Sequence, residues 1–333
     1  MTIVEHRGRA MASDVHLVVV AADAGAARAA ARRGQRLLEG LERTWSRFLP
    51  GSDIDRLNRA AGVTIDIEPT TTVLLDVMRR AHRITEGRLD PTILPSLVAH
   101  GYIDRRTGRP DRSLAAMSAG SASSPRRAGL AELRLDTARH QAQLPVGVAL
   151  DPGAIGKGTA ADLVVVDLLD DLAAVDERAG VLVSVGGDLA FGGTAPEGGW
   201  SIDIADPHTD PNTDTRSASH GCPVAARRQV GGAGGVATSS TRSHRWTGPD
   251  GAGRHHVLDS ATGRSSTTDL VSVTVVAGAG WLAEAAATAL LLAGSDGIAA
   301  EAARLSGLEE FSDGSIDYVA IPERPTDRAQ AAA

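Results

Sequence analysis

Residues 151–158, with the sequence DPGAIGKG, constrain this chain more than any other segment. A short apolar run at 146–150 precedes them, and a strong helical pattern at 159–172 follows. Glycines between a strand and a helix let the backbone approach a ligand closely, and a helix start offers free N–H groups to an anion. Lys157 adds a positive charge. The segment indicates a loop for a phosphate-bearing molecule. An ordinary helix start with a solvated lysine fits about equally well, because neither common nucleotide-binding fingerprint is matched.

Composition narrows the class of protein. The chain has 333 residues, enough for one large or two moderate domains, and 42% of them are hydrophobic. Only 3% are aromatic, so the core must be aliphatic. A net charge of −7 gives no footprint for nucleic acid, and the single cysteine, Cys222, excludes an internal disulfide and a thiolate metal cluster. Residues 1–10 are polar and carry no signal peptide, so we expect a cytoplasmic protein that does not span a membrane.

Hydrophobic periodicity predicts both helices and strands. We expect helices at 26–45, 52–59, 70–85 and 280–293, with Ser52 as an N-cap. We expect strands at 15–21, 181–185, 200–205 and 271–277, and a hairpin formed by 132–135 and 141–144. These elements lack the regular spacing of a doubly wound βαβ sheet, which favours an α+β fold.

The domain boundaries follow from composition. We expect an N-terminal extension at 1–10, one domain at 11–322 that can divide into two lobes, and a disordered tail at 323–333. Within the domain, 111–129 is rich in Ser, Ala, Arg and Gly, and 206–221 is polar and turn-rich. Both are expected to be loops.

Two further motifs suggest a ligand or a cation. The segment 184–188, SVGGD, ends a predicted buried strand with a double glycine and an acid, although an ordinary tight turn is the better interpretation of this motif alone. Glu284 and Thr288 lie four residues apart, and therefore on one face, in a helix made almost wholly of Ala and Leu. A buried carboxylate needs a partner or a cation, and an all-oxygen pair suits Mg²⁺. The alternative is a glutamate that interacts with the dipole at its helix start.

Two segments with aromatic side chains also contain candidate site residues. In the segment 254–259, RHHVLD, an extended backbone would send His255 and His256 to opposite sides, so only one can face a given pocket. That histidine could be a general base or a phosphate contact, and a solvated hairpin edge is an equal alternative. Phe48 stands out in an aromatic-poor chain and could stack on a flat ring, although core packing is the more common role of such a side chain.

Taken together, seven stretches resemble the ApbE family, the FAD:protein FMN transferases, and occur in the order typical of that family. They cover about residues 11–295. The stretches are WSRF at 45–48 with Ser52, Leu57 and Asn58; LDPT at 89–92; Asp151 with IGKG at 155–158, Ala161 and Asp162; VSVGGD at 183–188; ATS at 237–239; HVLD at 256–259 with Thr262 and Gly263; and SVTV at 272–275 with Glu284, Thr288 and Ala289.

The resemblance implies a fold and a reaction. The fold would be α+β, with mixed or antiparallel sheets flanked by helices. In such enzymes FAD and Mg²⁺ bind together, and a Thr or Ser hydroxyl of a partner flavoprotein attacks the FMN-side phosphorus of FAD. AMP leaves, and FMN stays linked to the acceptor as a phosphoester. Positioning and charge neutralisation should dominate such a transfer.

The resemblance also implies roles for individual residues. His256 would be the base for the incoming hydroxyl. The backbone oxygen of Ala154 and the side chains of Glu284 and Thr288 would hold Mg²⁺. The residues that would contact FAD or line its site are Met11, Phe48, Asn58, Asp90, Thr92, Asp151, Lys157, Gly187 and Thr238.

Three positions depart from the family pattern. Glu284 stands where an aspartate is usual, Ser260 where a proline is usual, and Ser240 where a glycine is usual. Many family members carry a lipoprotein signal, and this sequence has none at its start. Two alternatives to the transferase therefore stay open from sequence. One is a Mg²⁺-dependent FAD pyrophosphatase that yields FMN and AMP, and the other is a flavin-binding protein without catalysis.

Overall fold

The computed structural model describes residues 1–60, 62–102, 129–209, 223–248, 250–311 and 316–324. The helices are α1 (Ala24–Trp45), α2 (Asp53–Arg59), α3 (Pro69–Ile84), α4 (Leu94–Ala99), α6 (Gly156–Ala173) and α7 (Gly280–Ser306), with single 3₁₀ turns η1 (Leu130–Glu132), η2 (Pro152–Ala154) and η3 (Glu309–Phe311). The strands are β1 (Thr2–Ala10), β2 (Ser13–Ala21), β3 (Ile65–Asp66), β4 (Arg134–Asp136), β5 (Gln141–Gln143), β6 (Gly180–Val185), β7 (Asp188–Gly193), β8 (Trp200–Ala205), β9 (Val224–Val230), β10 (Gly234–Ser240), β11 (Arg245–Thr247), β12 (Gly253–His255), β13 (Leu258–Asp259), β14 (Arg264–Ser265), β15 (Leu270–Ala277) and β16 (Asp317–Pro322).

A seven-stranded antiparallel sheet organises the molecule, in the order β1-β2-β6-β7-β10-β15-β16. Its central strands are rich in valine and are buried along most of their length, as expected of strands covered on both faces. The helices and antiparallel sheets confirm the predicted α+β fold. The expected strand at 200–205 also forms, but it pairs with β9 in a separate hairpin.

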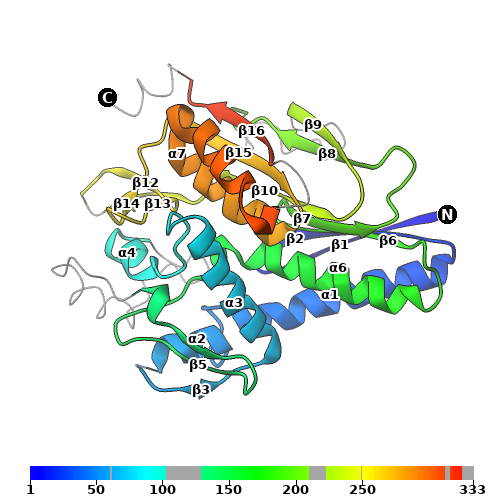
Figure 1. The fold of residues 1–333 in the computed structure, drawn as a ribbon, viewed down its shortest axis with the longest axis horizontal. Helices are drawn as coiled ribbons and strands as arrows, with labels where there is room; N and C mark the ends of the chain where they lie inside the picture. The colour runs from blue at the N-terminus through cyan, green and yellow to red at the C-terminus, as the bar shows by residue number, and fades with distance from the viewer. Residues whose placement is uncertain (61, 103–128, 210–222, 249, 312–315, 325–333) are drawn as a thin grey trace.

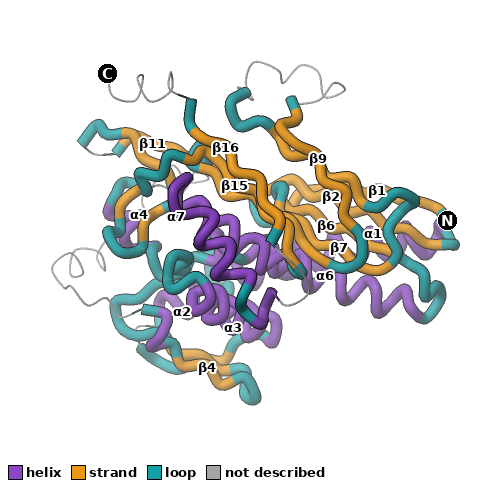
Figure 2. Tube along the Cα trace, turned by 45° about the horizontal axis from the view of Figure 1, so that its top comes forward, coloured by secondary structure: helices purple, strands orange, loops and turns teal. Residues whose placement is uncertain are grey.

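Helices α1, α6 and α7 cover one face of this sheet, and α1 runs beside α6 (Figure 1). Small residues on α1 let it pack closely, because a side chain at Gly34 would meet Leu17 of β2 and Leu168 of α6. Figure 2 shows the strands as one layer with the helices alongside it. On the opposite face a smaller apolar cluster includes Phe191 of β7 and Trp200 of the β8–β9 hairpin.

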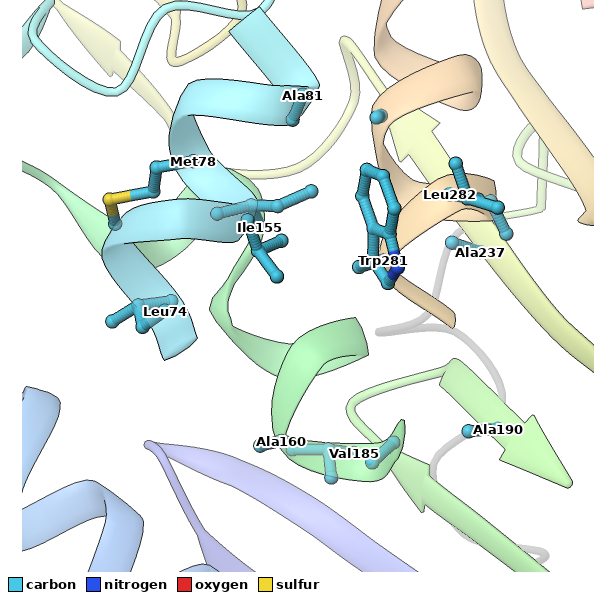
Figure 3. Close-up of a cluster of buried hydrophobic side chains, with 14 of the residues drawn as sticks. Leu74, Met78, Ala81, Ile155, Ala160, Val185, Ala190, Ala237, Trp281 and Leu282 are labelled. Atoms are coloured by element: carbon cyan, nitrogen blue, oxygen red, sulfur yellow. The ribbon is translucent and has the colours of Figure 1, made fainter. Parts of the chain in front are cut away.

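A second group of elements lies at one end of the sheet, where α2 and α3 gather with the small sheet β3-β5-β4 (Figure 1). The predicted hairpin at 132–144 is the β4–β5 pair. On α3, Leu74 and Met78 are buried, whereas Val73 is 41% exposed. Figure 3 shows Ile155 between α3 and Trp281 of α7, so the loop after residue 150 is fixed by the apolar core.

Helix α7 is longer than the predicted 280–293. At Gly294 the backbone leaves the helical region, with φ 69° and ψ 175°, and the helix then continues to Ser306. The second part begins because Ser295 N donates to Asp269 Oδ1 at 2.9 Å. Among the described helices, α7 alone has the length and mean hydropathy, 1.3, of a possible membrane span, and 61% of that apolar stretch is buried inside the fold.

The chain ends need one correction. Residues 1–10, expected as an extension ahead of the domain, form β1, which pairs with β2 from Thr2–Ala21 to Ala10–Ser13. Of the loops expected at 111–129 and 206–221, only residues 129 and 206–209 are described, and of the tail at 323–333 only residues 323 and 324. The remainder of those three predictions lies outside the described residues.

Candidate functional site

The loop at 151–158 is fixed in place by its neighbours. Asp151 caps the turn η2, because its Oδ1 accepts from Gly153 N at 2.9 Å. Its own N–H donates to Pro91 O at 2.8 Å. One residue earlier, the amide of Asn58 pairs with the backbone of Leu150, accepting from its N at 2.8 Å and donating to its O at 3.0 Å. Segments far apart in sequence therefore hold the Asp151 carboxylate in one position.

Asp90 and Thr92 support this loop from the side. Thr92 donates to Asp90 Oδ1 twice, from its backbone N at 2.8 Å and from its hydroxyl at 2.6 Å. The compact turn that results presents the carbonyl of Pro91 to Asp151. The structure thus gives Asn58, Asp90 and Thr92 a role in shaping the loop, and their expected contact with FAD stays a prediction.

A charged network lies at the start of α6. Lys157 Nζ forms an ion pair with Asp188 Oδ2 and lies 3.6 Å from Glu284 Oε1. Gly158 N donates to Glu284 Oε2 at 2.9 Å. Burial raises the pKa of Glu284, and the charge of Lys157 and the Gly158 N–H oppose this rise. One N–H group of this helix start, that of Gly158, therefore serves Glu284, and the loop as a phosphate site stays a prediction.

Asp188 belongs to this network, although sequence reasoning assigned it no role. Besides Lys157, its carboxylate accepts from Thr238 N at 3.3 Å, which ties β7 to β10. The side chain is only 4% exposed. A signal did exist in the sequence, because an acid follows the double glycine at the end of a buried strand. Nothing in the sequence alone, however, paired it with Lys157.

Two tight turns lie beside Lys157. Gly186 and Gly187, between β6 and β7, have φ of 62° and 94°, which glycine adopts at no steric cost. Met11, between β1 and β2, also has a positive φ, 54°. Because β2 pairs with β6, the two turns are neighbours, and Gly186 N donates to Asp14 O at 2.8 Å. A methyl group added at Gly187 would have open space around it, which agrees with a ligand-facing turn.

Hydroxyl groups line the adjoining part of β10 and α7. Thr288 Oγ1 lies 2.8 Å from Ser239 Oγ, and Thr238 Oγ1 lies 2.8 Å from Thr274 Oγ1. Glu284 lies one helical turn before Thr288 and is buried, whereas Thr288 is half-buried. The expected pair on one face of α7 is therefore present, and Thr238 touches the same network through Asp188.

The residues expected to hold Mg²⁺ are Glu284, Thr288 and, through its carbonyl, Ala154. Glu284 is a buried carboxylate that already draws the Lys157 ammonium to 3.6 Å, so its surroundings favour positive charge. Thr288 adds a hydroxyl oxygen, and Ala154, the last residue of η2, is the expected source of a third oxygen through its carbonyl. Among the described residues no three His, Cys, Asp or Glu side chains form a metal cluster. The residues fit a cation that takes a single carboxylate, as Mg²⁺ does.

His256 lies between β12 and β13, and its Nδ1 is 3.2 Å from Ser243 O. A carbonyl only accepts, so Nδ1 carries the proton and Nε2 keeps its lone pair. The ring of His244 packs edge-on against that of His256, with centroids 5.0 Å apart. Burial of the ring, followed by the charges of His244, His255 and Lys157, lowers the pKa of His256 to about 4. The side chain is therefore neutral near pH 7.

The neighbouring histidine faces a different segment. His255 Nε2 lies 3.1 Å from Ser266 O, whereas His256 bonds to Ser243. This arrangement agrees with the expectation that only one of the two can face a given pocket. The charge of Lys157 also lowers the pKa of His256, but less than burial and the neighbouring histidines do.

Comparisons with known proteins support a single family. The model of the ApbE family matches residues 11–311. The chain is 30% identical over 290 residues to the FAD:protein FMN transferase of Rhodobacter capsulatus, covering 85% of this chain and 50% of the relative. It is 32% identical over 254 residues to the enzyme of that name from Salmonella typhimurium, covering 73% of this chain and 65% of the relative. The chain thus spans about half the length of the first relative.

Solved structures agree on the fold. The ApbE protein of Thermotoga maritima superposes with a TM-score of 0.75 at 23% identity, covering 98% of this chain and 99% of that chain. The apo flavinyl transferase ApbE of Pseudomonas stutzeri gives 0.70 at 22% identity, covering 97% and 92%. Since the family model matches residues 11–311 and the fold agrees, this chain belongs to the ApbE family.

Proposed function

We propose that this protein transfers FMN from FAD to a Thr or Ser hydroxyl of a partner flavoprotein in a Mg²⁺-dependent reaction that releases AMP. Relatives at about 30% identity are named FAD:protein FMN transferases. The observation that carries the proposal is the meeting of Lys157, Asp188 and Glu284 at the start of α6. His256 adds a ring that is neutral near pH 7. A lysine, carboxylates that can hold a metal cation, and a neutral base are the parts that phosphoryl-type transfer to a hydroxyl uses.

The proposed transfer forms one bond, breaks one bond and moves one proton. The oxygen of the acceptor hydroxyl forms a bond to the FMN-side phosphorus of FAD, and the bond from that phosphorus to the bridging oxygen breaks. AMP leaves with the electron pair of that bond. His256 Nε2 accepts the hydroxyl proton, because Nδ1 is held as a donor by Ser243 O. Lys157 places an ammonium beside the pyrophosphate, and a bound Mg²⁺ would supply further charge neutralisation at Glu284 and Thr288.

The reaction is tested by incubating the full chain with FAD and Mg²⁺, with and without an acceptor flavoprotein. AMP and FMN are separated by chromatography, and protein-bound flavin is measured by fluorescence in a denaturing gel. The proposal expects AMP and protein-bound flavin together, only with acceptor and metal present. AMP with free FMN and no need for acceptor would instead identify a pyrophosphatase. FAD binding without AMP would identify a flavin-binding protein.

The place of action is a separate proposal. We infer that the enzyme acts in the cytoplasm. Fractionation of cells that produce the protein from its native gene, followed by immunodetection, tests this inference. Recovery in the membrane or in an exported fraction would contradict it.

A further inference from the structure

The side chain of Arg47, just after α1, is buried next to the loop at 151–158. Only 5% of the side chain is exposed, and its Nε lies 3.2 Å from Asp151 Oδ2. That Nε makes no hydrogen bond within the described part of the chain, so the link to Asp151 is one of charge. Gly153 N holds the other carboxylate oxygen at 2.9 Å. Arg47 and Gly153 together therefore fix both oxygens of Asp151.

Aromatic rings surround the guanidinium group of Arg47. Its central carbon lies 3.8 Å from the centroid of the Phe48 ring and 5.7 Å from that of Tyr102. Tyr102 packs edge-on against Trp246, with centroids 5.2 Å apart. The chain has only three Phe, two Tyr and four Trp residues, so two rings beside one cation, with a third ring against one of them, are a marked concentration of a scarce residue type. A planar guanidinium suits stacking between rings, and an ammonium does not.

The ring contacts lead from the loop towards His256. Trp246 lies on β11, opposite Arg254 of β12, and β12 ends one residue before His256. Trp246 Nε1 donates to His100 O at 2.8 Å, which holds the hairpin against the segment after α4. A continuous set of contacts, from Asp151 through Arg47, Tyr102 and Trp246, therefore joins the loop to the hairpin that carries the predicted base.

We propose that Arg47 is a positioning residue of the flavin site. It fixes the Asp151 carboxylate and the Phe48 ring for a flat, ring-bearing dinucleotide, and through Tyr102 it sets the place of the β11–β12 hairpin. This proposal rests on the proposed function for the identity of the ligand. Arg47 needs no contact with the ligand itself, because its two neighbours are the groups expected to make that contact. Lysine at this position would keep the charge and lose the stacking.

The test is a titration of the full chain with FAD, without acceptor, followed by flavin fluorescence and calorimetry. The variants are Arg47→Met, Arg47→Lys and a matched control, Arg33→Met. Arg33 is also an arginine of the α1 region in an ion pair, with Asp167 at 2.6 Å, but it is partly exposed. Arg47→Met should bind FAD about tenfold more weakly or worse, because the half-buried Asp151 carboxylate loses its buried cationic partner. Arg47→Lys should fall between Arg47→Met and wild type, and Arg33→Met should bind like wild type.

A second pair of measurements separates positioning from mere stability. With an acceptor present, Trp246→Leu should lower kcat and leave the FAD affinity close to wild type, whereas Arg47→Met should raise KM for FAD as well. Wild-type FAD affinity in a folded Arg47→Met would overturn the proposal. An equal loss of FAD affinity in Arg47→Lys and Arg47→Met would overturn the role of the Arg47 charge. If wild type binds FAD but transfers nothing, the proposed function fails while the titration still decides the role of Arg47. If Arg47→Met does not fold, Arg47→Lys and Tyr102→Leu provide the same comparison.

Discussion

Around the start of α6, charged side chains lie close to side chains of opposite charge. Lys157 pairs with Asp188 and lies 3.6 Å from Glu284, while Arg47 faces Asp151. Three carboxylates thus meet two cations. An anionic pyrophosphate would raise the negative charge further, so a divalent cation would be needed to offset it.

Removing the charge of Glu284 should weaken this cation site. Glu284→Gln keeps an oxygen that can accept from Gly158 N but loses the negative charge. Mg²⁺ affinity in the presence of FAD should fall about tenfold or more, measured by calorimetry. Glu301→Gln is the matched control, because Glu301 is another buried glutamate of α7 that pairs with Arg304 at 2.7 Å. Unchanged Mg²⁺ binding in Glu284→Gln would remove that residue from the proposed metal set.

The low pKa of His256, about 4, fixes the expected pH dependence of transfer. A general base must be neutral, so kcat/KM should stay level on lowering the pH through the ordinary histidine range, about 6.5, and fall only near about pH 4. His256→Ala should lower the rate about a hundredfold or more while FAD still binds. His255→Ala is the control, since that ring bonds elsewhere. A wild-type acid limb near pH 6.5, or full activity in His256→Ala, would contradict the assignment.

At the scale of elements, the starts of α6 and α7 are locked together. A side chain at Gly158 would clash with Gly280 O at 2.6 Å, so the two helix starts can approach only as glycines. Asp162 of α6 caps α7, accepting from Gly280 N at 2.7 Å and Trp281 N at 2.9 Å. Glu284 owes its place beside Lys157 to this junction.

The junction predicts a pH dependence of stability. Burial raises the pKa of Asp162 to about 7, and its two N–H donors oppose the rise. Between about pH 4 and 7 the folded state therefore holds more protons than the unfolded state, so the free energy of unfolding falls as pH rises. Asp162→Asn does not titrate. The stability of wild type relative to Asp162→Asn, from urea unfolding, should be greater at about pH 5 than at about pH 8, by at most about 3 kcal/mol. An equal difference at both pH values would show that Asp162 stays ionised.

Sequence periodicity predicted most of these elements and not their junctions. The helices of 26–45 and 70–85 and the buried strand of 181–185 form within a few residues of their expected ends, because their apolar patterns are local. Helix α7 exceeded its prediction, since the donor at Ser295 is satisfied by Asp269 from another segment. For the same reason, the sequence alone predicted no role for Asp188 or Arg47. Their partners are distant in sequence, and only the family resemblance brought the other candidates together.

At the scale of the whole molecule, the sheet includes the very start of the chain. β1 completes the edge of β2 along nine residues, Thr2–Ala10, so its removal would expose a row of unpaired backbone groups. A chain that begins at Met11 should lose about 5 °C or more in Tm by calorimetry. Removal of residues 325–333 is the control and should leave Tm unchanged. A truncated chain as stable as the full chain would restore the view of 1–10 as a dispensable extension.

The strand order also has a kinetic consequence. Strand β2 lies between β1, its neighbour in sequence, and β6. One edge of β2, for example at Val15, therefore stays unpaired until Val185 of β6 is in place. Such distant pairings fold slowly, because loop closure must precede the contacts that stabilise it. On the ribosome, Phe48 and Asn58 emerge long before Lys157, Asp188 and Thr288 exist. Under the proposed function, FAD therefore cannot act as a template for the nascent chain, because the predicted site is complete only once β15 and α7 have been synthesised and have folded.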